Sequence, residues 1–162
     1  MGKAMKTRKS WAEKLADDKG LPRVQRVTGG LSRRWGTGTM VIPAPREVDA
    51  LMKQVPRGRV TTIHELCAAL ASRHHADFAC PLTTGIFAWI AAHAAAEAAA
   101  AGRKRVTPYW RTLKAGGELN SKYPGGIETV RPLLETEGHR LETRGKRCFV
   151  AGFRERLFSR FV

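Results

Sequence analysis

The sequence contains little cysteine and no long uninterrupted apolar run, and each of these absences excludes a class of protein. Its three cysteines stand at unrelated spacings, which excludes the disulfide framework of small secreted domains. The longest apolar stretch, residues 86–101, is alanine-rich and interrupted by His93 and Glu97, so it is too weakly hydrophobic to span a bilayer. No apolar segment of a secretory signal follows the basic N-terminus. We therefore expect a cytoplasmic protein with no membrane partner.

Acidic residues are scarce relative to basic ones. The chain has 14 aspartates and glutamates against 29 lysines and arginines, a formal net charge of +15. Such a surface attracts polyanions and releases their counterions on binding, which favours nucleic acid as the partner. The excess gathers at two ends of the chain. Residues 1–35 hold ten basic and three acidic residues, and residues 138–162 hold seven and two.

The patterns of common catalytic sites are also missing. The sequence shows no glycine-rich phosphate loop, no paired carboxylates and no Ser-His-Asp arrangement. Five potential zinc ligands lie near one another: His64, Cys67, His74, His75 and Cys80. Their spacing matches no compact zinc motif, so we predict no metal and no other cofactor. Cys80 precedes Pro81 at an expected helix start, where the helix dipole stabilises a thiolate, and an enzyme using Cys80 or a metal is one alternative.

The first part of the chain carries few periodic signals. Residues 1–9 form a basic tail that we expect to be disordered. Ser10 and Glu13 predict the capped start of a helix over residues 11–19, ended by Gly20. Glycine and proline recur through residues 21–44, which we expect to be mostly irregular, with a helical turn near residues 31–35. The compact part is expected to begin at Pro45.

Regular elements are easier to place beyond that point, from apolar periodicity, caps and turn residues. We expect helices over residues 46–54, 63–72, 81–101 and 127–137, a strand over residues 60–62, and a hairpin over residues 139–150. On the long helix we expect Ile86, Trp89, Ile90 and His93 to form the buried face. Two helices joined by a short connector, followed by a basic hairpin, are typical of a winged helix-turn-helix. We predict an α/β fold with a basic extension (1–42), a winged helix-turn-helix (43–138) and a C-terminal basic hairpin and tail (139–162).

The order of short motifs across residues 43–138 resembles the DNA-binding domain of the O6-alkylguanine-DNA alkyltransferases. The motifs are Pro43-Ala-Pro-Arg-Glu-Val-Asp, Val55-Pro-Arg-Gly-Arg-Val-Thr-Thr, Thr83-Thr-Gly-Ile-Phe-Ala-Trp, Pro108-Tyr-Trp-Arg, Tyr123-Pro-Gly-Gly and Leu133-Leu-Glu-Thr-Glu-Gly. The resemblance implies a winged helix-turn-helix whose recognition helix begins near Cys80. It also implies a pocket for an extruded, alkylated base.

The reactive centre of that family is replaced in this sequence. The resemblance places Tyr109 at the acceptor cysteine, Trp110 at the activating histidine and Arg131 at the glutamate that orients it. An unperturbed phenol, with a pKa near about 10, is no substitute for an activated thiolate. Leu82 stands at the arginine that fills the gap of the flipped nucleotide, and Ile63 at the tyrosine that turns the phosphate. The chain is most similar in kind to the non-enzymatic alkyltransferase-like proteins, which bind the lesion and recruit repair.

We therefore predict a non-catalytic protein that binds double-stranded DNA and recognises alkylated or extruded bases, with a repair protein as a further partner. A transcriptional or nucleoid DNA-binding protein is the other alternative. The predicted DNA contacts are Arg57, Arg59, Thr61, Leu82, Thr83, Thr84, Gly85, Arg103, Lys104, Arg105 and Arg111. The predicted base pocket consists of Tyr109, Trp110 and Tyr123.

Overall fold

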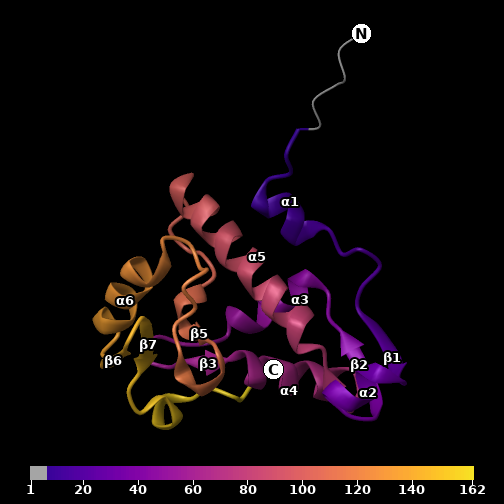
Figure 1. The fold of residues 1–162 in the computed structure, drawn as a ribbon. Coiled ribbons are helices and arrows are strands. Elements are labelled where there is room, and N and C mark those ends of the chain that lie inside the picture. Colours follow the sequence, from indigo (N-terminus) through magenta and orange to yellow (C-terminus); the bar gives the residue numbers. More distant parts are fainter. Residues whose placement is uncertain (1–6) are drawn as a thin grey trace.

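A long helix, α5 (Pro81–Ala100), runs through the middle of the fold, and the other elements are arranged around it (Figure 1). The computed structural model describes residues 7–162, so most of the predicted disordered tail lies outside the described residues. Helix α5 is rich in alanine, and Ala88, Ala91 and Ala92 are completely buried. Small side chains let neighbouring helices approach its axis closely.

The fold is of the mixed α/β type, as predicted. Before α5 the chain forms α1 (Trp11–Ala16), β1 (Arg23–Val27), α2 (Gly30–Trp35), β2 (Gly38–Ile42), α3 (Pro45–Met52), β3 (Thr61–Thr62), α4 (Ile63–Arg73) and β4 (Phe78–Ala79). After α5 it forms β5 (Thr112–Leu113), α6 (Gly126–Thr136), β6 (Leu141–Arg144) and β7 (Arg147–Val150). Short 3₁₀ turns lie at Tyr109–Arg111, Ala115–Gly117 and Phe153–Arg156. The expected boundary between residues 1–42 and the rest stays a prediction.

The prediction of a mostly irregular segment over residues 21–44 is wrong. Strands β1 and β2 pair as an antiparallel hairpin, from Arg23 opposite Ile42 to Val27 opposite Gly38, and β4 joins β2 in parallel. The glycines that suggested irregularity serve local turns. At Gly38 the backbone φ is +126°, and a Cβ atom there would collide with the Asp77 carboxylate, which accepts a hydrogen bond from the Thr39 amide at 2.8 Å. The helical turn predicted near residues 31–35 is confirmed as α2.

The core surrounds α5 and follows the apolar positions of α3, α4 and α6. Val48, Leu51 and Met52 of α3 and Leu66 and Leu70 of α4 are at most 1% exposed, as their helical spacing predicts. The face predicted for α5 is only partly right. Ile90 is buried, whereas Ile86 is 45% exposed and Trp89 and His93 are half-buried. Because alanine covers most sides of this helix, apolar residues alone do not identify its buried face.

The caps and the C-terminal hairpin form as predicted. The Thr62 hydroxyl accepts a hydrogen bond from the Glu65 amide at the start of α4, and Ser10 does the same for Glu13 at the start of α1. Strands β6 and β7 pair from Leu141 opposite Val150 to Arg144 opposite Arg147. Helix α1 is shorter than predicted and ends at Ala16, because Asp17 adopts an extended backbone conformation.

Helix α1 is held against α5 by one carboxylate and a ring stack. The Glu97 side chain accepts hydrogen bonds from the Trp11 and Ala12 amides at 3.1 and 3.2 Å, which satisfies two free N–H groups at the helix start. The Trp11 ring stacks on His93, with centroids 4.4 Å apart, and meets the edge of Trp89 at 4.8 Å. The N-terminal segment is therefore bound to the domain through α5.

Replacing Glu97 with alanine should release α1. Loss of a helix cap costs about 1 kcal/mol, so the undocked fraction should rise about five-fold or more. Trypsin should then cut after Lys14 and Lys19 correspondingly faster, while cleavage elsewhere changes little. The control is Glu128→Ala, which removes an exposed glutamate of α6. Equal cleavage rates in the native protein and the Glu97→Ala variant would contradict this account of α1 docking.

A buried histidine makes stability depend on pH near neutrality. His139 is 6% exposed, and its Nε2 atom has no hydrogen-bond partner among the described residues. Burial lowers the pKa of His139 below its usual 6.5, although Glu137 opposes the shift. A histidine with a lowered pKa in the folded state favours folding most when it is neutral. The stability that it confers is therefore present above about pH 6.5 and lost as the pH falls through the lower, folded-state value.

The free energy of unfolding should consequently decrease between pH 7.5 and 5.5, above the range where carboxylates titrate. In the His139→Leu variant this decrease should be smaller, because the variant has no proton to take up at this position. Urea denaturation at a series of pH values measures both slopes. The same slope in the variant and the native protein would show that His139 is not the group responsible.

Candidate nucleic-acid interface

A large, mostly apolar cleft lies along the N-terminal half of α5. Its volume is about 940 Å³, which lies within the range of small-ligand sites. It is lined by Ile63, Pro81, Leu82, Gly85, Ile86, Trp89, His93, Lys114, Ala115, Asn120, Ser121 and Lys122. One wall is therefore α5, with Ile63 from the start of α4, and the other is the 114–122 segment that follows β5. We call this the apolar cleft.

Two large apolar side chains are exposed at this cleft. Leu82 is 63% exposed and Ile86 is 45% exposed, and both come from the first turns of α5. Most large aliphatic side chains in this chain are buried, so a pair of them along a cleft marks a candidate binding surface. The helix start beside them carries a partial positive charge, which favours a nearby phosphate.

The start of α5 is fixed by local hydrogen bonds. Cys80 is its N-cap and Pro81 occupies the first helical position, where no N–H is needed. The Thr84 hydroxyl donates to the Cys80 carbonyl at 2.8 Å, and the Thr83 hydroxyl donates to the Cys80 sulfur at 3.2 Å. These bonds leave Leu82 as the side chain that projects from the first turn.

Trp89 provides an aromatic surface in the cleft. It lies one helical turn beyond Ile86 and two turns beyond Leu82, on the same side of α5. Its indole N–H donates to the Lys122 carbonyl at 3.1 Å, which ties α5 to the opposite wall. His93 meets the Trp89 ring edge-on, with centroids 5.0 Å apart. The ring is thus held in place from two sides and remains half-buried.

Two lysines give the apolar cleft a positive rim. Lys122 is exposed and has no acidic partner among residues 7–162. Lys114 lies 3.4 Å from Glu118, which also pairs with Arg147 at 2.8 Å. The hydrogen bond from Arg147, together with the nearby Lys114 charge, lowers the pKa of Glu118. One carboxylate is thus shared by two cations, which leaves a net positive charge on this side of the cleft.

Only some of the predicted DNA contacts lie at the apolar cleft. Leu82 and Gly85 line it, and Thr83 is half-buried beside them. Thr61 and Thr84 are completely buried, and both donate to backbone carbonyls, so in this structure neither side chain is exposed to a ligand.

The predicted basic contacts are spread over the molecule. Arg57 and Arg59 are exposed, and their guanidinium groups donate to the Thr136 and Glu155 carbonyls at 3.3 and 3.4 Å. Arg103, Lys104 and Arg105 are exposed in the segment that follows the 20-residue helix α5, and none of them lines the apolar cleft. Sequence order suggested one surface, but a helix of this length separates these three residues from the cleft.

The predicted base pocket is part of the core. Tyr109 contacts Trp110 and Tyr123 edge-on, with centroids 5.4 and 5.7 Å apart, so the three rings do come together. Tyr109 and Tyr123 are only 6% and 3% exposed, however, and none of the three rings lines the apolar cleft. Burial raises the pKa of both phenols. In this structure the three rings pack in the core and do not line an open cavity, and their assignment to a base pocket stays a prediction.

An acidic side chain lies beside Trp110. From the resemblance, we expected Arg131 at the position of the orienting glutamate. Glu137 accepts a hydrogen bond from the Trp110 indole at 3.0 Å and forms an ion pair with Arg111 at 2.6 Å. Arg131 is exposed and pairs with Glu135 one turn away on α6. Arg111 also donates to the Val55 carbonyl at 2.8 Å, so its guanidinium group is engaged within the fold.

Neither alternative chemistry gains support from the structure. Cys80 is 4% exposed and packs with Val27 and Met40. Cys67 is partly buried, and burial raises the pKa of its thiol. Within residues 7–162 no group of three or more histidine, cysteine or acidic side chains could hold a metal ion. No helix in the same range is long and apolar enough to cross a membrane.

Ile86, Trp89, Lys114 and Lys122 were not among the predicted site residues. A stripe of Leu82, Ile86, Trp89 and His93 at helical spacing could have identified the α5 wall. Ile86, Trp89 and His93 were interpreted as part of a buried face because apolar periodicity does not distinguish a core from a cleft. The lysines lie in an irregular segment, and no sequence signal places them beside α5.

Solved structures with a similar fold are complexes of an alkyltransferase-like protein with DNA. One is S. pombe Atl1 in complex with damaged DNA containing O6-carboxymethylguanine, with a TM-score of 0.50 and 16% identity. The other is the S. pombe ATL protein in complex with DNA, with a TM-score of 0.50 and 14% identity. Each alignment covers 70% of this chain and 93% of the other. At this identity the likeness concerns the fold. No family model and no curated protein sequence matches the chain.

Proposed function

We propose that the chain is a non-catalytic protein that binds double-stranded DNA and holds an extruded or alkylated base in the apolar cleft. The observation that carries the proposal is the cleft itself, with exposed Leu82 at the start of α5 and Lys114 and Lys122 on the rim. The net charge of +15 and the fold likeness to a DNA-bound alkyltransferase-like protein support it. In this proposal residues 43–138 carry the helix-turn-helix, and the hairpin of β6 and β7 that follows them acts as the wing.

The side chains of the apolar cleft match the needs of a base that is extruded from the duplex. Apolar side chains such as Leu82 can fill the space that an extruded nucleotide leaves in the duplex. The Trp89 ring provides a stacking surface, and base–aromatic stacking tolerates different bases. Lys114 and Lys122 can contact the phosphates that flank that nucleotide. The proposal thus assigns to Trp89 the contact with the base that the sequence analysis assigned to the pocket of Tyr109.

The proposal includes the absence of methyl transfer. Tyr109 is a buried phenol with a raised pKa. Among the described residues, no side chain that could act as a general base is hydrogen-bonded to its hydroxyl. In the proposal the protein acts in the cytoplasm. A repair protein that recognises its complex with the lesion-containing DNA would then process the lesion. Intact mass spectrometry after incubation with an oligonucleotide containing O6-methylguanine should show an unchanged protein mass. A gain of one methyl group would overturn the non-catalytic assignment.

Fluorescence anisotropy of a labelled unmodified duplex, across a salt series, tests the DNA partner. Affinity should fall steeply with salt, because each neutralised phosphate contributes a slope of about 0.9 in a log–log plot. An affinity that does not change with salt concentration, or no binding at low salt, would contradict a DNA-binding function. A short duplex of scrambled sequence is the control for sequence-directed binding, as expected of a transcriptional protein. The proposal predicts the same affinity for both sequences.

A further inference from the structure

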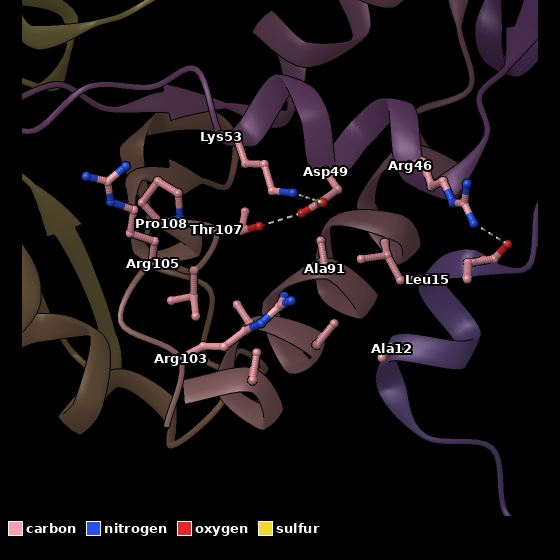
Figure 2. Close-up of a pocket in the computed structure, with 15 residues that line it drawn as sticks. Ala12, Leu15, Arg46, Asp49, Lys53, Ala91, Arg103, Arg105, Thr107 and Pro108 are labelled. Carbon is pink, nitrogen blue, oxygen red and sulfur yellow. Dashed lines mark hydrogen bonds and ion pairs between the residues drawn. The ribbon is translucent and has the colours of Figure 1, made fainter. Parts of the chain in front are cut away.

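A second pocket lies at the other end of α5, between α1, α3 and the 103–108 segment (Figure 2). Its volume is about 490 Å³, enough for a small organic molecule. The floor consists of small α5 side chains, Ala91, Ala94, Ala95 and Ala98. Helix α1 adds Ala12, Leu15 and Ala16 as one wall. Docking of α1 on Glu97 thus completes an enclosure that α3 and α5 alone would leave open.

Basic side chains surround this pocket and greatly outnumber acidic ones. Four cationic residues line it, Arg46, Lys53, Arg103 and Arg105, against one acid, Asp49. The Asp49 carboxylate is buried and already satisfied, because it accepts hydrogen bonds from the Thr107 hydroxyl at 2.6 Å and Lys53 at 3.0 Å. No acid within residues 7–162 forms an ion pair with the three arginines. The pocket therefore carries an uncompensated positive charge.

The side chains divide the pocket into a charged and an apolar part. Figure 2 shows Arg103 extending over α5 toward the middle of the pocket, whereas the Arg105 guanidinium is turned outward. Arg46 donates to the Ala16 carbonyl at 3.5 Å, on the α1 side. Lys53 approaches from α3 and is 59% exposed. An anionic group would thus meet Arg103 and Lys53, while the remainder of the ligand would contact the alanine floor.

We propose that this pocket binds a phosphate monoester whose organic part is apolar and fits the alanine floor. Arginine presents a planar fork that matches phosphate oxygens, and a dianion balances the excess charge better than a single carboxylate. Desolvation of apolar atoms against Ala91 and Ala95 adds affinity that inorganic phosphate cannot obtain. The site is separate from the apolar cleft, so it can be occupied whether or not DNA is bound.

Calorimetric titration of the full chain with phenyl phosphate tests the proposal, with inorganic phosphate and phenol as the two partial probes. Phenyl phosphate should bind at least about ten-fold more tightly than either partial probe, because only it uses both parts of the pocket. Equal affinity for phenyl phosphate and inorganic phosphate would overturn the apolar-floor assignment. Amide chemical shifts should change at Ala94, Ala98 and Thr107, and changes confined to the cleft residues would overturn the location.

Two variants separate this site from general attraction of anions. Arg103→Ala should weaken phenyl phosphate binding about ten-fold, whereas Arg140→Ala, which removes an exposed arginine near the C-terminal hairpin, should not. Ala98→Leu should block the floor while leaving the charge unchanged. Both pocket variants should keep DNA affinity within about three-fold, so this proposal and the DNA-binding proposal can fail independently. Equal weakening by Arg103→Ala and Arg140→Ala would contradict a specific site.

Discussion

Replacing Glu137 with alanine should lower the free energy of unfolding by about 3 kcal/mol, since removal of one partner strands a buried charge. The Glu137 and Arg111 side chains are only 5% and 14% exposed, and the carboxylate also accepts the Trp110 N–H. Burial opposes ionisation, but the hydrogen bonds from Arg111 and Trp110 outweigh it and lower the pKa of Glu137. The stability from this carboxylate is present above about pH 4.5 and lost as the pH falls through its folded-state pKa.

The neighbouring pair on α6 provides a matched control. Glu135 pairs with Arg131 at 2.8 Å, but both side chains are about half exposed, at 50% and 45%. Glu135→Ala should therefore cost at most about 0.5 kcal/mol. Urea denaturation at pH 7 measures both variants. Losses of the same size would mean that the Arg111–Glu137 pair does not join α6 to the segment carrying Tyr109.

Reversing both rim charges of the apolar cleft should weaken duplex binding about 100-fold at about 0.1 M salt. In the Lys114→Glu/Lys122→Glu variant two contacts that attract phosphates become repulsive, and each lost contact also lowers the salt slope by about 0.9. Both side chains are exposed, so the fold should tolerate the change. Anisotropy of a labelled duplex across a salt series measures the affinity and the slope together.

The control variant makes the same change in net charge at the opposite end of α5. Lys104→Glu/Arg105→Glu also replaces two exposed cations with acids, and neither of these residues lines the apolar cleft. Its affinity should fall by no more than about ten-fold, through the general field alone. Comparable losses in both variants would show that DNA does not approach the apolar cleft. Such a result would favour the predicted contacts at Lys104 and Arg105.

Local signals in the sequence predicted the elements well. The caps at Ser10 and Thr62 form as predicted because each depends on residues three positions apart. The C-terminal hairpin follows from alternation around Gly145, which also needs no distant partner. The hairpin of β1 and β2 was missed because glycines at the ends of its strands suggested irregular structure, and because the third strand, β4, joins it from more than 35 residues away.

The site was harder to predict, because its two walls meet only in the folded chain. Leu82 and Gly85 were identified from the resemblance, and both line the cleft. Tyr109 was assigned to a pocket because the resemblance implied a reactive residue there, but packing against Tyr123 buries its ring. Trp89 was assigned to the core because an alanine-rich helix gives no clear polar face. Its contact with the Lys122 carbonyl is a tertiary interaction with no sequence signal.

The most direct test of the account compares two duplexes that differ only in one O6-methylguanine. Anisotropy titrations should give an affinity at least about ten-fold higher for the modified duplex, because a weakened base pair lowers the cost of extrusion into the cleft. The Trp89→Phe variant keeps an aromatic ring and should retain most of this preference. In the Trp89→Ala variant the preference should disappear while salt-dependent binding to the unmodified duplex persists. Equal affinity of the native protein for both duplexes would contradict base recognition by the apolar cleft.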